Sequence, residues 1–341
     1  MIKHILNFKR PSGTSRGILT SKETFFLVIE QEEKKGIGEC NLFRGLSADD
    51  VPNYEAKLQW VEQHLHLGEK ALLEELKTFP SIQFGVEQAF RSVAAPQWYE
   101  LFPSNFTKGK DAIPINGLIW MGSPDSMKAQ IKEKLAQGFR CIKMKIGAID
   151  FEEEYRILKA LRNEFSANDI EIRVDANGAF QATEALRYLE RLATLQLHSI
   201  EQPISAGQWE AMAELCEQTP LAIALDEELI GVFTREEKQR LLREIQPQYI
   251  ILKPSLIGGY SSSEEWITLS ETLGIGWWVT SALESNIGLN AIAQWTYTLH
   301  SSMPQGLGTG TLYTNNIPFP LYVENGHLGF NPCERVTFPF S

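Results

Sequence analysis

Charged residues end five apolar segments of this chain at nearly constant spacing. Asp175 ends IEIRVD, Glu201 ends HSIE, Asp226 ends LAIALD and Lys253 ends QYIILK. These four residues are 26, 25 and 27 residues apart, and Lys145, which ends FRCIKMK, precedes the first of them by 30. One strand followed by one helix spans such a length. The spacing therefore predicts that the five side chains lie at the same end of neighbouring parallel strands.

Three carboxylates at one end of a barrel would repel each other unless a cation lies between them. A single acidic residue after a strand is more often a helix N-cap or a surface residue, but three in consecutive units form a more specific signal. Ligand sets made only of oxygen favour a hard cation, Mg²⁺ more than Zn²⁺. We therefore expect Asp175, Glu201 and Asp226 to bind Mg²⁺, with Mn²⁺ as an alternative ion.

Two lysines, Lys143 and Lys145, lie two residues apart in the otherwise apolar segment CIKMKIG. Side chains two apart on a strand share a face, so both should point into the barrel near its mouth. Burying ammonium groups is costly unless anions compensate them, and the three carboxylates and an anionic substrate would do so. Desolvation, the second lysine and a metal would lower the pKa of Lys145, which could then remove a proton from carbon beside a metal-bound carboxylate.

Apolar segments alternate with helical patterns from residue 111 onward, which predicts strands that alternate with helices. The expected strands are IPINGLIW, FRCIKMKIG, IEIRVDA, HSIEQPI, LAIALDE, QYIILKP and IGWWVTS. Seven such units, with residues 305–311 as a weak eighth strand, predict an α/β fold, a closed (β/α)₈ barrel. An open doubly wound sheet is the alternative. No GxGxxG follows the first strand, which counts against a dinucleotide-binding version of that sheet.

The segments outside the barrel predict a second unit. Residues 1–110 indicate an α+β capping domain, with the C-terminal residues 312–341 packing back on it and the barrel spanning 111–311. The expected strands and helices of the capping domain are 23–31, 34–40, 51–77 and 84–95. Two segments rich in Gly, Ser and Arg, 10–17 and 41–50, are expected to be loops that could close over a site.

Composition narrows the class of protein. The chain of 341 residues has 43% hydrophobic and 22% charged residues, an ordinary globular balance. A net charge of −11 without a basic tract argues against a nucleic-acid partner, and no apolar stretch long enough to span a membrane is present. Four cysteines without a CxxC pair indicate neither a zinc ribbon nor a disulfide framework. We expect a cytoplasmic protein that acts on a small anionic carboxylate. The oligomeric state is not indicated.

Taken together, in this order and at this spacing, the motifs resemble those of the enolase superfamily, muconate-lactonizing-enzyme subgroup, over nearly the whole chain. Enzymes of that superfamily combine a Lys or His base with Mg²⁺. The motifs that carry the resemblance are GIGE (36–39), KMK (143–145), DAN (175–177), EQP (201–203), LDE (225–227) and the lysine of LKPS (252–255). The resemblance implies a capping domain over a modified barrel with one Mg²⁺, held by the three carboxylates.

The resemblance also implies roles for other side chains. Lys145 and Lys253 would be the acid/base pair, with Lys253 facing the first lysine across the barrel. Lys143 would contact the substrate carboxylate, and Asn177 would lie close to it. Arg16, in the first of the two loops, is a candidate for closing over the substrate.

Within that subgroup the chain resembles the o-succinylbenzoate synthases of menaquinone biosynthesis. The segment TSALESNIG is similar to their Ser-rich ESxxG segment, which would place Ser281 and Ser285 near a succinyl carboxylate. That anion would also suit the N-terminus of the helix after the seventh strand. The segment GLGTGTLYTNN lacks the acidic DxD of dipeptide epimerases, and the His–Asp pair of mandelate racemases is absent. The implied reaction is Mg²⁺-assisted α-proton abstraction and syn dehydration of 2-succinyl-6-hydroxy-2,4-cyclohexadiene-1-carboxylate.

Other functions stay open at this point. An N-acylamino acid racemase, a dipeptide epimerase or a cycloisomerase of the same superfamily would use the same base and metal. A barrel lyase that forms a lysine imine is a different enzyme class. A non-catalytic barrel that serves as a binding protein is a third class. The complete set of three carboxylates and three lysines argues against this last function.

Overall fold

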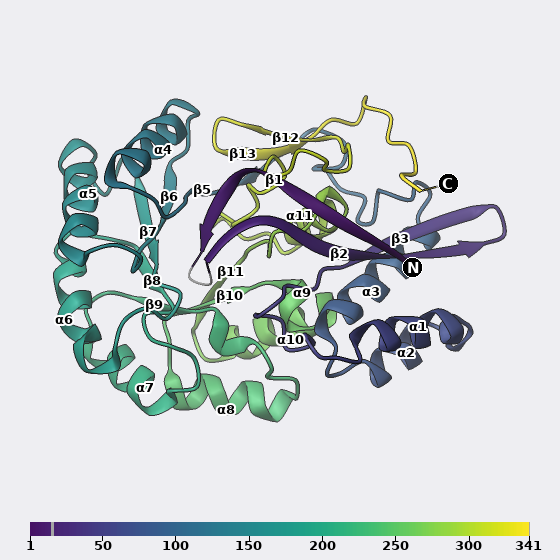
Figure 1. Ribbon diagram of the computed structural model, residues 1–341, viewed down its shortest axis with the longest axis horizontal. Helices are drawn as coiled ribbons and strands as arrows, with labels where there is room; N and C mark the ends of the chain where they lie inside the picture. Colours follow the sequence, from purple (N-terminus) through teal and green to yellow (C-terminus); the bar gives the residue numbers. More distant parts are fainter. Residues whose placement is uncertain (15–16, 341) are drawn as a thin grey trace.

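A curled sheet of seven parallel strands forms the centre of the computed structural model, which describes residues 1–14 and 17–340. The strands neighbour each other in chain order (Figure 1). They are β5 (Gly117–Ile119), β6 (Cys141–Lys145), β7 (Glu171–Asp175), β8 (Ser199–Glu201), β9 (Ile223–Leu225), β10 (Tyr249–Leu252) and β11 (Gly276–Val279).

Helices follow these strands and cover the outside of the sheet, so the core lies between the strands and this outer layer (Figure 1). They are α4 (Pro124–Ala136), α5 (Phe151–Glu164), α6 (Ala182–Ala193), α7 (Trp209–Gln218), η2 (Glu227–Leu229), α8 (Arg235–Ile245), α9 (Pro254–Ile257), α10 (Gly259–Thr272) and α11 (Asn286–Thr298). None of the helices in the described residues combines the length and apolar composition that crossing a membrane requires.

Two residues close the sheet into a barrel. Gln305 bridges Ile115, just before β5, and Gly306 bridges Thr280, just after β11, both in parallel orientation. The backbone N–H of Gly306 donates to the carbonyl of Val279 at 2.8 Å. The predicted α/β barrel is therefore confirmed, and its eighth strand position is as short as its weak pattern suggested.

The N-terminal residues form an antiparallel sheet of β1 (Ile2–Thr14), β2 (Gly17–Gln31) and β3 (Lys34–Cys40). Its helices are α1 (Tyr54–His64), η1 (Leu65–Leu67), α2 (Glu69–Glu75) and α3 (Pro80–Ala94). Helix α3 packs on β3 so closely that a Cβ at Gly38 would lie 1.9 Å from the carbonyl oxygen of Gly85. The glycines of the GIGE motif thus permit a close contact that positions the residues after them.

The expectation that residues 10–17 form a loop was wrong for the first part of that segment, because β1 continues to Thr14. Strand β1 pairs with β2 along its length, with a shift in register between Asn7 and Ser12. Pro11 falls inside this irregular section, where its missing N–H removes no regular ladder hydrogen bond. The Gly- and Ser-rich composition suggested a loop, but pairing with β2 holds residues 12–14 in a strand.

The C-terminal segment contacts both parts of the chain. Strands β12 (Leu321–Glu324) and β13 (His327–Phe330) form a small sheet with β4 (Ile113–Pro114). Farther on, the Phe340 ring lies 5.1 Å from that of Phe26 in β2. We propose the division into a capping domain of residues 1–110 with 312–341 and a barrel of 111–311. The Phe26–Phe340 contact and the separate sheet of β1–β3 support it.

Candidate active site

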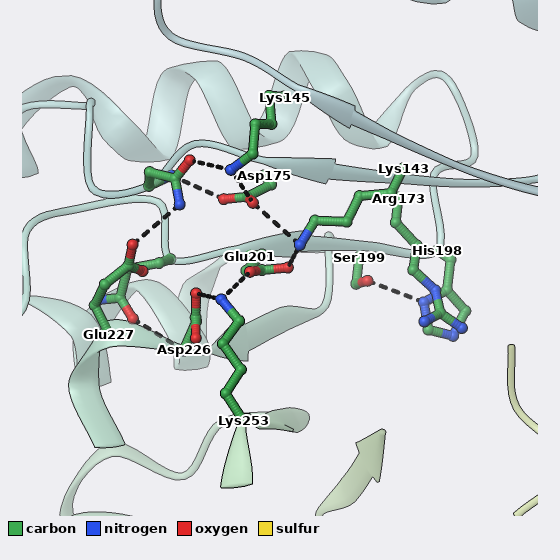
Figure 2. Close-up of polar contacts among 12 residues, drawn as sticks. Lys143, Lys145, Arg173, Asp175, His198, Ser199, Glu201, Asp226, Glu227 and Lys253 are labelled. Atoms are coloured by element: carbon green, nitrogen blue, oxygen red, sulfur yellow. Dashed lines mark hydrogen bonds and ion pairs between the residues drawn. The ribbon is translucent and has the colours of Figure 1, made fainter. Parts of the chain in front are cut away.

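The structure brings the strand-end charged residues together at one mouth of the barrel. Lys145 lies opposite Asp175 in the β6–β7 ladder, and Asp175 lies opposite Glu201 in the β7–β8 ladder. Asp226 and Lys253 directly follow β9 and β10. Figure 2 shows Lys145 and Lys253 approaching the carboxylates from opposite sides.

Lysines and carboxylates alternate in this cluster. The Nζ of Lys143 donates to Oε2 of Glu201 and lies 3.1 Å from Oδ2 of Asp175. On the other side, the Nζ of Lys253 donates to Asp226 and lies 3.7 Å from Oε1 of Glu201. The three carboxylate residues are each at most 3% exposed. Three ammonium groups compensate their charge, and this compensation makes the burial of so much charge tolerable.

The environments of the carboxylates differ. Burial acts to raise the pKa of Asp175, but the ammonium groups of Lys143 and Lys145 outweigh it and hold this pKa well below its ordinary value. Burial, followed by the charge of Asp175, raises the pKa of Glu201 to about 8. Burial also raises the pKa of Asp226. Neighbouring carboxyl groups held in unlike environments are typical of functional sites.

The pKa values of Lys143 and Lys253 depend on both burial and the neighbouring carboxylates. Burial alone would lower the pKa of Lys143 and of Lys253. Burial is the largest single influence on each lysine, but the neighbouring carboxylates together outweigh it and raise both pKa values. Asp175 contributes most among them for Lys143, and Asp226 for Lys253.

The donor set fits a hard divalent cation by its chemistry. All candidate ligand atoms are carboxylate oxygens, and Oε1 of Glu201 is buried and accepts no hydrogen bond from the described residues. Among those same residues, no three His, Cys, Asp or Glu side chains are grouped as a ready metal site. Each carboxylate instead faces a lysine ammonium group.

Asn177 connects the lysine side of the site to a residue that the sequence reasoning did not assign. Its Oδ1 accepts from Nζ of Lys145 at 2.7 Å, and its Nδ2 donates to Oε1 of Glu227 at 3.0 Å. Its backbone N–H donates to Asp175 at 3.0 Å. Asn177 therefore orients Lys145. Glu227, the last residue of the LDE motif, lines the cavity beside it.

A cavity opens above these charges with a polar floor and apolar walls. The floor is formed by Lys143, Lys145, Asp175, Asn177 and Lys253. The walls include Phe43, Leu46, Leu118, Trp120, Leu256 and Leu283. Such a cavity suits an anion attached to an apolar ring. The loop pattern of 41–50 is the sequence signal that pointed to Phe43 and Leu46, and Trp120 is the last residue of the expected strand IPINGLIW.

The two serines of TSALESNIG have different surroundings in the structure. Ser281 lines the cavity, and its Oγ lies 2.6 Å from Oγ1 of Thr309. Ser285 does not line it, because its Oγ donates to Oε2 of Glu39 at 2.6 Å and it caps α11. Glu39 also accepts from the backbone N–H of Gly288, so a carboxylate of the protein already occupies this helix N-terminus. This geometry does not support a contact between Ser285 and substrate. Arg16 lies outside the described residues.

The chain is similar to known proteins over most of its length. A family model described as "Enolase C-terminal domain-like" matches residues 126–331. An o-succinylbenzoate synthase from Desulfotalea psychrophila is 46% identical, with 95% of this chain and 96% of that protein covered. The crystal structure of MenC from the same organism superimposes with a TM-score of 0.86 at 43% identity, covering 96% of this chain and 98% of the other.

The fold also extends to relatives with other activities. The L-Ala-D/L-Glu epimerase from Bacillus subtilis, in a substrate-liganded complex, superimposes with a TM-score of 0.83 at 19% identity, covering 97% of this chain and 94% of that one. At that identity the likeness shows the fold alone.

Proposed function

We propose that this chain, which belongs to the enolase superfamily, is an o-succinylbenzoate synthase of menaquinone biosynthesis. It would be a metal-dependent hydro-lyase that removes water from 2-succinyl-6-hydroxy-2,4-cyclohexadiene-1-carboxylate. The observation that carries the reaction type is the alternation of three lysines with three carboxylates at the barrel mouth. The choice of substrate is supported by the 46% identity to a synthase over nearly the full length of both chains.

The metal ligands in this proposal are Asp175, Glu201 and Asp226, with Mg²⁺ as the ion and Mn²⁺ as an alternative. Their oxygen-only chemistry supports the assignment, as does Oε1 of Glu201, a buried atom that accepts no hydrogen bond from the described residues. When bound, the ion stabilises negative charge that develops on the substrate carboxylate.

Lys145 acts as the base in this account. In its neutral form it takes the proton from the ring carbon that bears the carboxylate. The electron pair left on that carbon forms a ring double bond as the C–O bond to the neighbouring hydroxyl breaks. The Lys145 ammonium group returns its proton to the departing hydroxide, which leaves as water. One lysine serving both steps on one face of the ring agrees with a syn elimination.

The other side chains hold the substrate and the base in place. Lys143 would contact the substrate carboxylate, and Asn177 would keep Lys145 oriented through the 2.7 Å hydrogen bond. Lys253, on the opposite side, would stabilise the anionic intermediate or lie over the ring as a cation–π partner. Arg16 would contact the substrate in this proposal.

The cavity walls support a ring-bearing dianion over a dipeptide. The ring would pack on Trp120 and Leu256, and the succinyl carboxylate would lie near Ser281. Residues 306–311, at the end of the barrel, contain no acidic side chain. The ammonium group of a dipeptide would lack an anionic partner there, which would cost several kcal/mol in a closed site.

A panel of substrates under saturating Mg²⁺ tests the proposal. The cyclohexadiene carboxylate is followed by the ultraviolet change that accompanies loss of its conjugated diene. N-acylamino acids and dipeptides are followed by optical rotation and by uptake of deuterium from solvent. Dehydration of the first compound is the expected result. Racemisation or epimerisation without dehydration would overturn the synthase assignment and leave the superfamily membership in place.

A further inference from the structure

One buried amide behind the cavity wall joins parts of the chain that are far apart in sequence. Asn41 follows β3 and is completely buried. Its Nδ2 lies 3.1 Å from Oγ of Ser255, 3.0 Å from the carbonyl oxygen of Ala282 and 3.0 Å from Oε1 of Glu284. Its Oδ1 accepts a hydrogen bond from the buried ammonium group of Lys22, in β2. An amide can both donate and accept, so it satisfies the cation and the oxygens together.

The segments that Asn41 joins are the ones that form the apolar wall of the cavity. Phe43 and Leu46 lie in the loop that begins at Asn41, Leu256 directly follows Ser255, and Leu283 directly follows Ala282. The capping domain supplies the first pair, helix α9 supplies Leu256, and the segment after β11 supplies Leu283. The amide therefore sets how the loop of residues 41–50 lies against two segments that follow barrel strands.

Backbone strain in the wall supports a functional role for this arrangement. Leu283 has φ = 62°, in the left-handed region that a branched residue rarely adopts. Its N–H donates to Oγ of Ser281 at 3.2 Å and its carbonyl accepts from the hydroxyl of Tyr313 at 2.7 Å. Strained backbone persists only where its surroundings determine it, and such positions cluster at ligand sites. The bond from Asn41 to the preceding carbonyl, that of Ala282, is part of that restraint.

We propose that Asn41 is a positioning residue that holds the 41–50 loop and the wall at Ala282 and Leu283 in their substrate-binding arrangement. It contacts none of the lysines and carboxylates at the floor in its hydrogen bonds. The chemistry at the floor and the fit of the apolar wall are therefore separable. Replacing Asn41 should therefore weaken substrate binding more than it slows the conversion of bound substrate to product. The kinetic part of this inference rests on the proposed function.

The matched control is Asn290, another buried amide that joins separate segments away from the cavity. It is 1% exposed, and its Nδ2 donates to the carbonyl of Tyr99 at 3.0 Å. Asn290→Ala and Asn41→Ala both remove a buried amide, so both should lower the melting temperature. Only Asn41→Ala should raise KM, by about tenfold, equivalent to about 1.4 kcal/mol of binding free energy, with kcat within about threefold of the parent.

Hydrogen exchange provides a readout that does not depend on the reaction. In Asn41→Ala, amides in residues 41–50 and 281–285 should exchange about tenfold faster than in the parent, while they stay unchanged in Asn290→Ala. Lys22→Met, which removes the partner of Oδ1 and leaves the donors of Asn41, should give a smaller increase in the same segments. If Asn41→Ala fails to fold, Lys22→Met tests the same inference by hydrogen exchange.

Two results would overturn the inference: exchange in both segments that matches the Asn290→Ala control, or a fall in kcat with KM unchanged. If the parent protein does not dehydrate the proposed substrate, the function is wrong, and the exchange comparison still decides the role of Asn41.

Discussion

Replacing Lys143 by Met should destabilise the protein strongly in chelator and much less in Mg²⁺. The Lys143 side chain is 7% exposed and bridges Asp175 and Glu201, which are 1% and 2% exposed. Met fills a similar volume without a charge. The substitution therefore leaves two buried carboxylates facing each other with less compensation, and only Lys145 and Lys253 remain beside them.

The size of the effect follows from the burial. Removing one partner of a buried ion pair costs about 3–5 kcal/mol, because the remaining charge is left without compensation. Unfolding entropy of about 2.1 cal/mol/K per residue over 341 residues is about 0.7 kcal/mol/K, so the melting temperature should fall by about 4–7 °C. A divalent cation bound by the same carboxylates restores the missing positive charge, so saturating Mg²⁺ should recover most of this loss.

Thermal denaturation of parent and variant in EDTA and in Mg²⁺ measures this difference. Lys238→Met is the matched control, since the Lys238 side chain is 1% exposed and pairs with Glu265 at 2.8 Å outside the cavity. That variant should lose the same stability in both buffers. If Mg²⁺ rescues Lys143→Met no better than the control, the cation does not bind between these carboxylates and the proposed metal site is refuted.

Three further predictions concern the chemistry and the pH dependence. Lys145→Ala should lose about 10²–10⁴-fold in kcat while its circular dichroism stays that of the parent, because general base catalysis is removed; a near-normal rate would assign the base elsewhere. Asp226→Asn should abolish activity at any Mg²⁺ or Mn²⁺ concentration, whereas the parent should lose activity in chelator and regain it with either ion; full activity in chelator would contradict the assignment. Burial raises the pKa of Glu87, whose carboxylate accepts the backbone N–H of Ser261, from 4.5 to about 7. The folded state thus binds the proton more tightly, and this group's contribution to stability falls as pH rises from about 4.5 to 7. As pH rises across that window, the free energy of unfolding measured in urea should fall less for Glu87→Gln than for the parent. If the free energies of the two proteins change equally with pH, the assignment to Glu87 is wrong.

The features that could be predicted from the sequence depend on local pattern. The barrel strands were recognised because each is a short apolar segment followed by a helical pattern, and the fold prediction is confirmed. Asp175 and Glu201 could be placed side by side because parallel strands in register align their ends. The closing position at Gln305 was predicted as weak, and it consists of isolated bridges.

The features that could not be predicted depend on partners far away in the chain. Ser285 fits a substrate-binding pattern, but its hydroxyl binds Glu39, which lies 246 residues earlier. Asn41 carries no motif, and its partners Ser255 and Ala282 are 214 and 241 residues away. Only the packing of the capping domain on the barrel brings these groups together, and no local periodicity records it.

Dehydration of the proposed substrate by the parent protein and by Lys145→Ala, measured side by side in Mg²⁺, tests the proposed reaction and its base together. Ultraviolet absorbance follows the loss of the diene, and nuclear magnetic resonance identifies the product. We expect the parent to form o-succinylbenzoate and Lys145→Ala, folded as the parent is, to form it at least about a hundredfold more slowly. Unchanged substrate with the parent would refute the proposed function, and equal rates for both proteins would refute Lys145 as the base.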